Sequence, residues 1–570
     1  MKILILLFII FLSLPIQAQV TNRYDVVITE IMADPTPQVG LPNAEWIELK
    51  NTSSIAVNLQ GWRVGDGSGV SGPIPAFVLQ PDSFVLVTTS SAVAALSQFG
   101  RTVAVTSFPS LDNDGELIYL RSAQGNTIHG VEYSVDWYQN AVKREGGWSL
   151  EMIDTKNPCT GMNNWKASVH PAGGTPGKKN SVDGISTDAS PPALKRAYAT
   201  DAYTLILFFD EPLDSLSASS VSKFTILPGI SIVSAIPIGP LFNTVQIKTG
   251  TSLIPGLVYT VTASNVADCK GNPIGIIKTT EVGLAQIVEK NDIVINEILF
   301  NPKPDAYDYV EFYNRSNKVI DVSKLSIANK NTAGIIGSIK NITDLPFLIF
   351  PGAYFVVTED ANSLSINYLV KNNDRVFSLS SLPSFPDNAG TVVLLNAQGI
   401  VIDEVKYDDD WHFDLIANDD GVALERIDPD GKSQDKSNWH SAASTAGYGT
   451  PGYQNSQYKQ TGGGNAIIEI SPKVFSPDND GRDDIATFSY NISQSGYLAN
   501  IFIFDASGRQ VRHLVKNDLL GSKGSWNWDG LGEQGRKLLI GTYIIYTELF
   551  NLDGKKQRFK NTIVLARRLN

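Results

Sequence analysis

The chain has 570 residues, of which 42% are hydrophobic, and it carries a net charge of −12 at pH 7. This length predicts several domains, and this composition is that of a folded globular protein rather than a disordered one. The acidic balance makes nucleic acid an unlikely partner, because a surface that is negative overall repels phosphates.

The first residues have the pattern of a secretory signal peptide. Lys2 precedes an apolar run from Ile3 to Leu14, and Ala18 offers a small residue just before an expected cut at Gln19. This run is too short to span a membrane, and no other apolar stretch of the sequence approaches spanning length. We therefore predict a signal peptide over residues 1–18, no transmembrane span, and a protein that is secreted or held at the outer cell surface.

A long part of the sequence occurs twice. Residues 26–50 read VVITEIMADPTPQVGLPNAEWIELK, and residues 293–314 read IVINEILFNPKPDAYDYVEFYN. The matched residues follow in the same order in both copies: Glu30 with Glu297, Glu48 with Glu311, Trp137 with Trp411, Glu151 with Glu425, Trp165 with Trp439, and the Gly-Thr-Pro-Gly segments at 174–177 and 449–452. This is an internal duplication. We call residues 20–182 repeat 1 and residues 291–455 repeat 2.

Both repeats have the pattern of β-sandwiches. Short β-rich runs such as WIEL (46–49) and LIYL (117–120) are bounded by Gly, Pro, Asn and Asp, which predicts an all-β fold of tandem Ig-like β-sandwich domains. The DNDG segment at 112–115 predicts a tight hairpin turn. A metal loop is the alternative there, but repeat 2 has Ala389 in place of the second Asp. The best short helix candidate lies at residues 91–99.

The repeated glutamates allow two interpretations. As paired carboxylates, Glu30 with Glu48 could serve general acid/base chemistry or hold a cation. That alternative, an extracellular hydrolase, predicts carboxyl groups about 5–9.5 Å apart in a cleft. The structural interpretation places them on the polar face of alternating strands, bonded to backbone or neighbouring side chains. We favour the second, because the chain has no Walker loop, G-x-S-x-G elbow or H-E-x-x-H motif.

The repeated tryptophans and the cysteines carry further expectations. Trp137 and Trp165, like Trp411 and Trp439, could stack on sugars or bases if exposed, but a Trp at a fixed place in a sandwich is typical of the core. Cys159 and Cys269 are the only cysteines, lie in different predicted domains and have no counterpart in repeat 2. We therefore expect no structural disulfide and no thiolate metal site.

The opening ITEIM…EWIELKN, the Trp positions, the DNDG turn and the closing GTPG resemble the lamin tail domain, an immunoglobulin-like sandwich. Repeat 2 is similar, with INEI (295–298) and YVEFYN (309–314). The resemblance implies a binding or scaffolding module and brings no catalytic residues. Repeat 2 departs at Tyr309 and Val422, which replace Trp46 and Trp148. This departure argues against a ligand site shared by the two repeats more than it argues against a shared fold.

Residues 186–286 differ from the repeats. The strand-like LILFFDEP (205–212) and the DCKGNP turn (268–273) follow a Ser-Pro-Pro opening. These features resemble bacterial Ig-like spacer domains, which implies a role in spacing and presentation.

The last part of the chain is predicted to be a linker over residues 456–465, containing Gly462–Gly464, and a domain over residues 466–570. FSPDNDGRDD (475–484), WNWDG (526–530) and GTY (541–543) resemble the C-terminal sandwich domains that route cargo through type IX secretion, with a likeness to the Ig-like domain of flagellar hook-capping proteins. The resemblance implies a type IX-type secretion machinery as a partner.

One metal site is suggested by this C-terminal domain. Asp478, Asp480 and Asp484 fall at alternating ligand positions around Gly481, as in a calcium loop. Ser476 and Thr487 stand where an Asp and a Glu are preferred, so an acidic turn with Asx hydrogen bonds is the alternative. No other cofactor is indicated.

Together, these features predict a non-enzymatic protein that binds or scaffolds an extracellular or cell-surface polysaccharide or protein. A structural surface component that self-assembles without a small ligand is the alternative, and the extracellular hydrolase is the third possibility.

Overall fold

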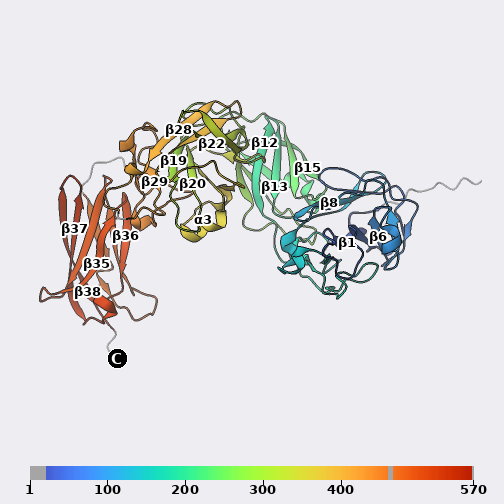
Figure 1. Cartoon of the computed structure of the whole chain (residues 1–570), viewed down its shortest axis with the longest axis horizontal. Helices are drawn as coiled ribbons and strands as arrows, with labels where there is room; N and C mark the ends of the chain where they lie inside the picture. Colours follow the sequence, from blue (N-terminus) through green and yellow to red (C-terminus); the bar gives the residue numbers. More distant parts are fainter. Residues whose placement is uncertain (1–20, 417, 460–465, 568–570) are drawn as a thin grey trace, which may run out of the picture. The chain divides into compact units, whose positions relative to one another are not determined.

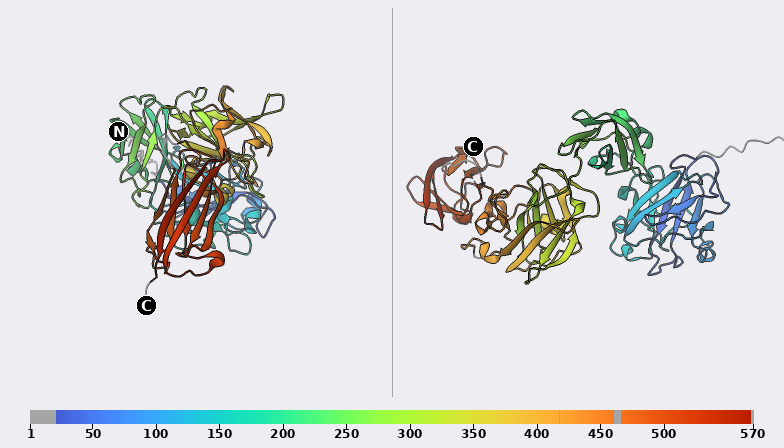
Figure 2. Two further views of the ribbon diagram at one scale, coloured as in Figure 1. Left: turned by 90° about the vertical axis from the view of Figure 1, so that its left-hand side faces the viewer. Right: turned by 90° about the horizontal axis from the view of Figure 1, so that it is seen from above.

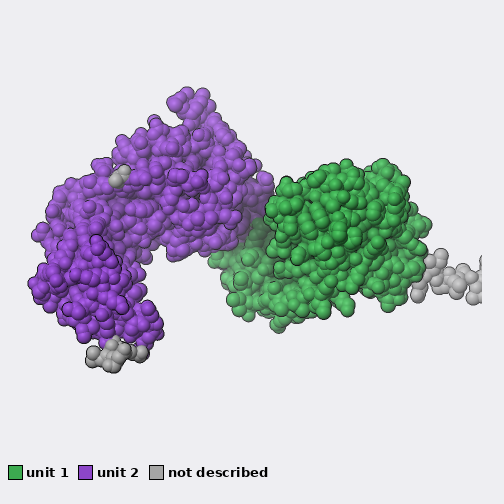
Figure 3. Space-filling view, turned by 60° about the horizontal axis from the view of Figure 1, so that its bottom comes forward, with its two compact units in different colours: residues 1–253, 259–282 green, residues 254–258, 283–570 purple. Residues whose placement is uncertain are grey.

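The computed structural model describes residues 21–416, 418–459 and 466–567. The predicted signal peptide lies outside the described residues, as do residues 460–465 of the predicted linker. Strands dominate the described chain and its helices are short (Figure 1), which confirms the all-β prediction. Two compact units comprise residues 1–253 with 259–282 and residues 254–258 with 283–570 (Figure 3). Within the described ranges, no helix has the length and apolarity needed to cross a membrane.

Repeat 1 is a sandwich built on a six-stranded sheet in the order β11-β10-β1-β2-β6-β7. A three-stranded sheet, β4-β8-β9, and the small pair β3-β5 complete it. Their bounds are β1 Val26–Met32, β2 Trp46–Asn51, β3 Val57–Asn58, β4 Arg63–Gly65, β5 Val78–Leu79, β6 Phe84–Thr88, β7 Thr102–Ala104, β8 Gly115–Arg121, β9 Thr127–Ser134, β10 Leu150–Met152 and β11 Trp165–Ala167. Helix α1, Val93–Leu96, lies inside the predicted helical stretch.

Repeat 2 has the same topology, with a six-stranded sheet in the order β26-β25-β20-β19-β29-β30. Its second sheet, β23-β22-β27-β28, has one strand more than that of repeat 1. The bounds are β19 Ile293–Leu299, β20 Tyr309–Asn314, β21 Ile320–Asp321, β22 Leu325–Lys330, β23 Ile336–Asn341, β24 Leu348–Ile349, β25 Tyr354–Thr358, β26 Val376–Ser378, β27 Ala389–Asn396, β28 Val401–Asp408, β29 Leu424–Arg426, β30 Trp439–Ser441 and α3 Ala361–Asn367. The duplication read from the sequence is therefore a duplication of strand order.

The other two domains are smaller sandwiches (Figure 2). The Ig-like domain pairs β12-β13-β16-β15 with β14-β17-β18, and the C-terminal domain pairs β31-β33-β36 with β32-β38-β37-β34-β35. The bounds are β12 Leu194–Asp201, β13 Thr204–Phe209, α2 Ser215–Ala218, β14 Phe224–Leu227, β15 Ile232–Ile238, β16 Thr244–Thr249, β17 Tyr259–Ala263, β18 Thr279–Val282, β31 Ile467–Ser471, β32 Val474–Phe475, β33 Ala486–Asn491, β34 Tyr497–Phe504, β35 Gln510–Leu519, β36 Lys523–Trp528, β37 Gly541–Asn551 and β38 Lys556–Leu565.

The central strands of the repeats are buried on both faces. All seven residues of β1 are buried, and so are all seven of β19. In each strand a β-bulge interrupts the register with the next strand, between Ile28 and Glu30 in β1 and between Ile295 and Glu297 in β19. A bulge shifts which residues stand opposite each other. Here it sets Glu30 opposite Glu48 and Glu297 opposite Glu311.

The predicted hairpin at residues 112–115 is wrong in one respect. The turn itself forms, with the Gly115 N–H donating to the Asp112 carbonyl at 3.2 Å. It leads into β8, however, and the hairpin that joins β8 to β9 closes later, where the Ser122 N–H donates to the Asn126 carbonyl. Composition correctly indicated a turn but did not show which strands it joins.

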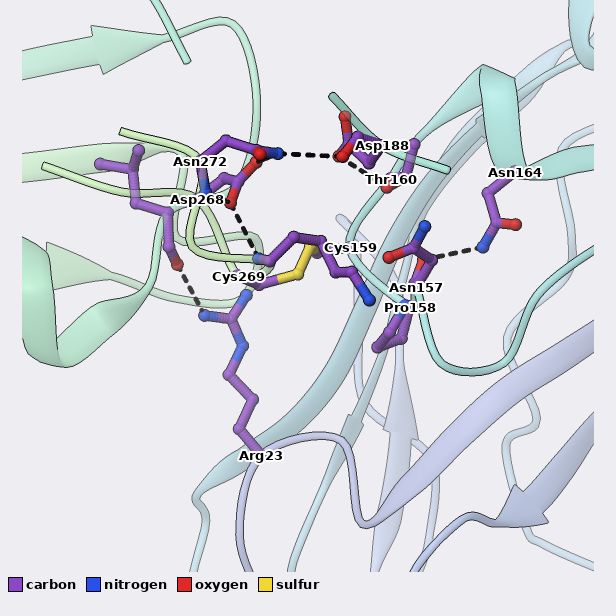
Figure 4. The surroundings of a disulfide bond; sticks show 12 residues. Arg23, Asn157, Pro158, Cys159, Thr160, Asn164, Asp188, Asp268, Cys269 and Asn272 are labelled. Atoms are coloured by element: carbon purple, nitrogen blue, oxygen red, sulfur yellow. Dashed lines mark hydrogen bonds between the residues drawn. A yellow bond between two sulfur atoms is a disulfide. The ribbon is translucent and has the colours of Figure 1, made fainter. Parts of the chain in front are cut away.

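The expectation of no disulfide is also wrong. Cys159 and Cys269 form a disulfide with a Cα–Cα distance of 6.4 Å (Figure 4). The two cysteines do come from repeat 1 and the Ig-like domain, but these domains pack together within one unit. Around the disulfide, the Thr160 hydroxyl donates to the Asp188 carboxylate at 2.9 Å and the Asn272 amide donates to the Asp188 carbonyl at 3.2 Å. The location of the two cysteines in different domains was therefore no argument against a disulfide between them.

Arg23 forms a second contact between these two domains. Its guanidinium donates to the carbonyls of Leu213 and Leu241, at 3.0 and 3.2 Å, and lies over the ring of Phe242. Burial lowers the pKa of Arg23, but a guanidinium stays charged in proteins. The contact therefore keeps a positive charge at this domain boundary.

We expect the double variant Cys159→Ser/Cys269→Ser to lose about 2–4 kcal/mol of the free energy of unfolding of residues 21–282, because the disulfide closes a loop of about a hundred residues. Denaturant unfolding would measure this loss. A thiol assay on unfolded, unreduced wild-type protein should find no free thiol. Two free thiols, or equal midpoints for variant and wild type, would contradict the disulfide.

Candidate functional site

Three glutamates lie side by side on adjacent strands in each repeat. In repeat 1, Glu30 on β1 stands opposite Glu48 on β2 and opposite Glu151 on β10. In repeat 2, Glu297 on β19 stands between Glu311 on β20 and Glu425 on β29 in the same way. All six side chains are 0% exposed. We call each set of three a carboxyl triad.

A short segment covers each triad and bonds to it. We call residues 174–177 and 449–452 the GTPG straps. In repeat 1, the Thr175 N–H donates to Glu30 Oε1 at 2.8 Å and the Gly177 N–H donates to Glu48 Oε2 at 2.6 Å. Thr175 Oγ1 lies 2.8 Å from Glu151 Oε1. One strap therefore contacts all three carboxyl groups.

Repeat 2 reproduces these contacts. The Thr450 N–H donates to Glu297 Oε1 at 2.9 Å and the Gly452 N–H donates to Glu311 Oε2 at 2.6 Å. Thr450 Oγ1 lies 2.9 Å from Glu425 Oε1. The equivalence extends to single oxygen atoms, so the motif that recurs in the sequence is a hydrogen-bonded unit.

The residues after each strap complete the site. The Ser181 hydroxyl donates to Glu151 Oε2 at 2.7 Å, and the Ser456 hydroxyl donates to Glu425 Oε2 at 2.7 Å. The Gln457 N–H also donates to Glu425, at 2.8 Å. Ser456 and Gln457 lie at the start of the predicted linker, and they also bond to Leu520 and Ser522 of the C-terminal domain.

Burial raises the pKa of four glutamates that stand opposite each other on the central strands of the two repeats, because a carboxylate loses its hydration in the protein interior. Burial, followed by repulsion from Glu151, raises the pKa of Glu30 to about 8. Burial and repulsion from Glu425 likewise raise that of Glu297 to about 8. Burial also holds the pKa values of Glu48 and Glu311 well above the ordinary range. Among the described residues, no ion pair involves a triad glutamate.

This geometry corrects both interpretations of the repeated glutamates. They bond to backbone and neighbouring side chains, as the structural interpretation predicted, but they do not lie on an exposed polar face. The carboxyl groups do lie together, as the catalytic alternative required, but a substrate has no access to side chains that are 0% exposed. Sequence reasoning missed Glu151 and Glu425 as members, although their repeated Leu-Glu context was the signal that could have identified them.

Trp165 and Trp439 are buried in the core, as predicted. Trp137 and Trp411 are only partly buried, and each packs against the buried tryptophan of its repeat. The ring centroids are 6.1 Å apart for Trp137 and Trp165 and 6.2 Å apart for Trp411 and Trp439.

The predicted calcium ligands do lie together in the C-terminal domain. Carboxylate oxygens of Asp478, Asp480 and Asp484 lie within 4.8 Å of one another. The Asp484 carboxylate also accepts three backbone N–H groups, from Asp478, Asn479 and Gly481, at 3.0, 2.6 and 2.8 Å. The Asx hydrogen bonds of the alternative also form, because the Asp480 N–H donates to Asp478 Oδ1 at 3.3 Å and the Arg482 N–H donates to Asp480 Oδ1 at 2.9 Å. An ion would have to share Asp484 with its three backbone N–H donors.

A second acidic group, which the sequence analysis missed, lies near the disulfide. Carboxylate oxygens of Asp188, Glu211 and Asp268 lie within 4.8 Å of one another. Burial and repulsion, chiefly from Asp188, raise the pKa of Glu211 to about 8. Asp268 is already bonded to the N–H groups of Lys270 and Asn272. Glu211 also lines a cavity of about 270 Å³ together with Trp137.

Comparison with known proteins finds the Lamin Tail Domain family at residues 19–134 and 288–409. These matches cover β1 to β9 and β19 to β28 and end before the strands and straps that complete the triads. A search of the curated proteins gives no match.

Solved structures are similar only at low identity and low TM-score. The N-terminal part of the bacterial S-layer protein SbsC is 16% identical, with a TM-score of 0.17, over 39% of this chain and 44% of that one. A DUF4876 family protein from Bacteroides thetaiotaomicron is 12% identical, with a TM-score of 0.17, over 38% and 87%. FlgD from P. aeruginosa is 20% identical, with a TM-score of 0.14, over 18% and 78%. This chain thus spans less than half of the SbsC fragment.

We expect Gly452→Ala to destabilise repeat 2 by about 3 kcal/mol or more, because a Cβ there would lie 1.8 Å from the Lys371 carbonyl oxygen. Gly399→Ala is the matched control. Gly399 has a similar positive φ, +73° against +85°, but a Cβ there meets nothing within 4 Å. It should cost only about 1 kcal/mol. Equal unfolding midpoints in denaturant for the two variants would show that the strap tolerates displacement.

Proposed function

We propose that this chain is a non-enzymatic binding or scaffolding protein that acts outside the cell, with its two repeats as the binding modules. The observation that supports this is the burial of both carboxyl triads. This repeated set of titratable side chains bonds to the straps and is closed to substrate, so it serves the fold of each repeat. The outer surfaces of the repeats are then the parts free to meet a partner.

The duplication favours a repetitive partner. Two linked modules bind a repeating ligand with higher avidity than one, provided both engage at once. A polysaccharide is a chain of repeated sugar units, and a surface-protein array consists of many copies of one protein. We therefore propose an extracellular or cell-surface polysaccharide or protein as the ligand class.

We expect purified protein comprising residues 19–570 to bind saturably to an insoluble polysaccharide in a pull-down, and to release no soluble sugar. DNA and anionic vesicles are the parallel baits, and the net charge of −12 predicts weak binding to both. Release of sugar would support the hydrolase. Failure with every bait, together with self-assembly seen by light scattering, would favour a structural surface component.

Thermal unfolding with calcium or a chelator tests calcium binding at Asp478, Asp480 and Asp484. We propose weak binding in the ~10⁻⁴–10⁻³ M range that is typical of extracellular modules. Calcium should then raise the thermal midpoint of the wild type but not that of Asp478→Asn/Asp480→Asn, a variant that keeps Asp484 and its three hydrogen bonds. An equal response of both proteins would exclude these ligands.

We also propose that residues 466–570 direct export through a type IX-type machinery, on the resemblance of the FSPDNDG, WNWDG and GTY segments. In a bacterium with that pathway, the chain lacking residues 466–570 should stay in the periplasm, while the whole chain reaches the surface or the medium. The full-length Glu132→Gln/Asp414→Asn variant, which changes one exposed carboxylate in each repeat and none in residues 466–570, is the control. Equal export with and without the domain would remove this role.

A further inference from the structure

The Thr450 hydroxyl lies between two carboxyl groups. Its Oγ1 is 2.9 Å from Glu297 Oε2 and 2.9 Å from Glu425 Oε1. A hydroxyl has one proton and can donate to only one of these oxygens. The other contact is a hydrogen bond only if that carboxyl group is protonated and donates to Thr450. The geometry of this strap therefore requires a proton on Glu297 or Glu425.

Repeat 1 has the same arrangement in a looser form. Thr175 Oγ1 lies 2.8 Å from Glu151 Oε1 and 3.5 Å from Glu30 Oε2. The hydroxyl here favours Glu151, so the proton in this triad belongs to the cluster rather than to one defined oxygen.

Among the residues that the structure describes, no cation forms an ion pair with a triad glutamate. In repeat 1, Lys166 stands opposite Glu151 but is exposed, and the Lys143 ammonium near Glu151 donates to the Ser168 carbonyl. In repeat 2, His440 stands opposite Glu425, and burial lowers the pKa of His440. The other titratable groups that face the second triad are tyrosines: Tyr309, Tyr354, Tyr368 and Tyr453.

We propose that each carboxyl triad holds at least one proton at neutral pH, shared through the strap threonine, and that loss of this proton at alkaline pH releases the GTPG strap from the sheet. Ionising the cluster fully would place three negative charges on adjacent strands in the interior. It would also leave two carboxylates to compete for the single proton of one threonine hydroxyl. The proposal is independent of the ligand proposed above.

The sign of the pH dependence follows from the pKa values of Glu30 and Glu297. Both are raised to about 8 in the folded chain, against an ordinary value of about 4.3 in an unfolded chain. The folded state therefore binds more protons between these limits. The contribution of the triads to the free energy of unfolding is greatest below about pH 4.3. It falls as the pH rises from there to about 8, and above that pH the cluster is ionised in the folded chain.

Strap release can be measured by hydrogen exchange in the whole chain. After correction for base catalysis, exchange of the Thr175, Gly177, Thr450 and Gly452 amides should speed up by about tenfold or more between pH 6 and pH 9.5. Amides of β37 in the C-terminal domain serve as the internal reference. Unchanged protection of the strap amides over this range would overturn the proposal.

The variant Glu30→Gln/Glu297→Gln tests the proton directly. A glutamine side chain carries no charge and its amide can donate to the threonine hydroxyl, as a protonated glutamate does. Strap exchange in this variant should change by less than about threefold over the same pH range. Glu132→Gln/Asp414→Asn, which removes one exposed carboxylate from each repeat, should behave like the wild type. Equal alkaline acceleration in both variants would overturn the proposal.

An infrared measurement on the wild type keeps the test open if the glutamine variant does not fold. Exposed carboxyl groups are ionised at pH 7, so a carbonyl band of protonated carboxylic acid at that pH would come from groups whose pKa is raised, which include Glu211 as well as the triads. We expect this band in the folded wild type and in Glu132→Gln/Asp414→Asn, and its loss at pH 10. Absence of the band at pH 7 would overturn the proposal whether or not the chain binds a polysaccharide.

Discussion

Burial of three carboxyl groups on adjacent strands is the constraint on which each repeat depends. An unpaired buried carboxylate is costly, and three of them would repel one another as well. The repeats meet this constraint with hydrogen-bond donors instead of cations. The backbone N–H groups of the strap and the hydroxyls of Thr175 and Ser181 supply these donors in repeat 1. The strap, the bulge in β1 and the last strands of the sandwich are thus parts of one hydrogen-bonded system.

The two repeats keep a hydroxyl donor to the central glutamate of the triad, although the residue that supplies it differs. Ser149 donates to Glu30 at 2.6 Å, but Ala423 at the matched place in repeat 2 has no hydroxyl. There the Tyr309 hydroxyl donates to Glu297, also at 2.6 Å. Tyr309 replaces Trp46, a difference that at the sequence level argued against a ligand site shared by the two repeats. It restores the donor that the alanine removes.

The sequence was sufficient for the fold class and the duplication but not for what covers the sheet. Alternating apolar runs and repeated landmarks predicted the sandwiches, and the repeated tryptophans predicted the core. Periodicity shows which face of a strand a side chain occupies, but not that a distant segment such as 174–177 lies over it. For that reason Glu30 and Glu48 were placed on the polar face of alternating strands without a covering segment, and Glu151 was not assigned to the group. The pairing of Cys159 with Cys269 was missed for the same reason, since it depends on how two domains pack.

The disulfide has a mechanical consequence. Tension applied through the backbone passes from Cys159 to Cys269 through the sulfur atoms, so the 109 residues between them carry no load. Strands β12 to β17 lie wholly within this bypassed segment. The bond also shortens the fully stretched chain by about 370 Å, at about 3.4 Å per residue. In a chain anchored at one end and pulled at the other, the Ig-like domain would keep most of its strands folded while its neighbours bear the force.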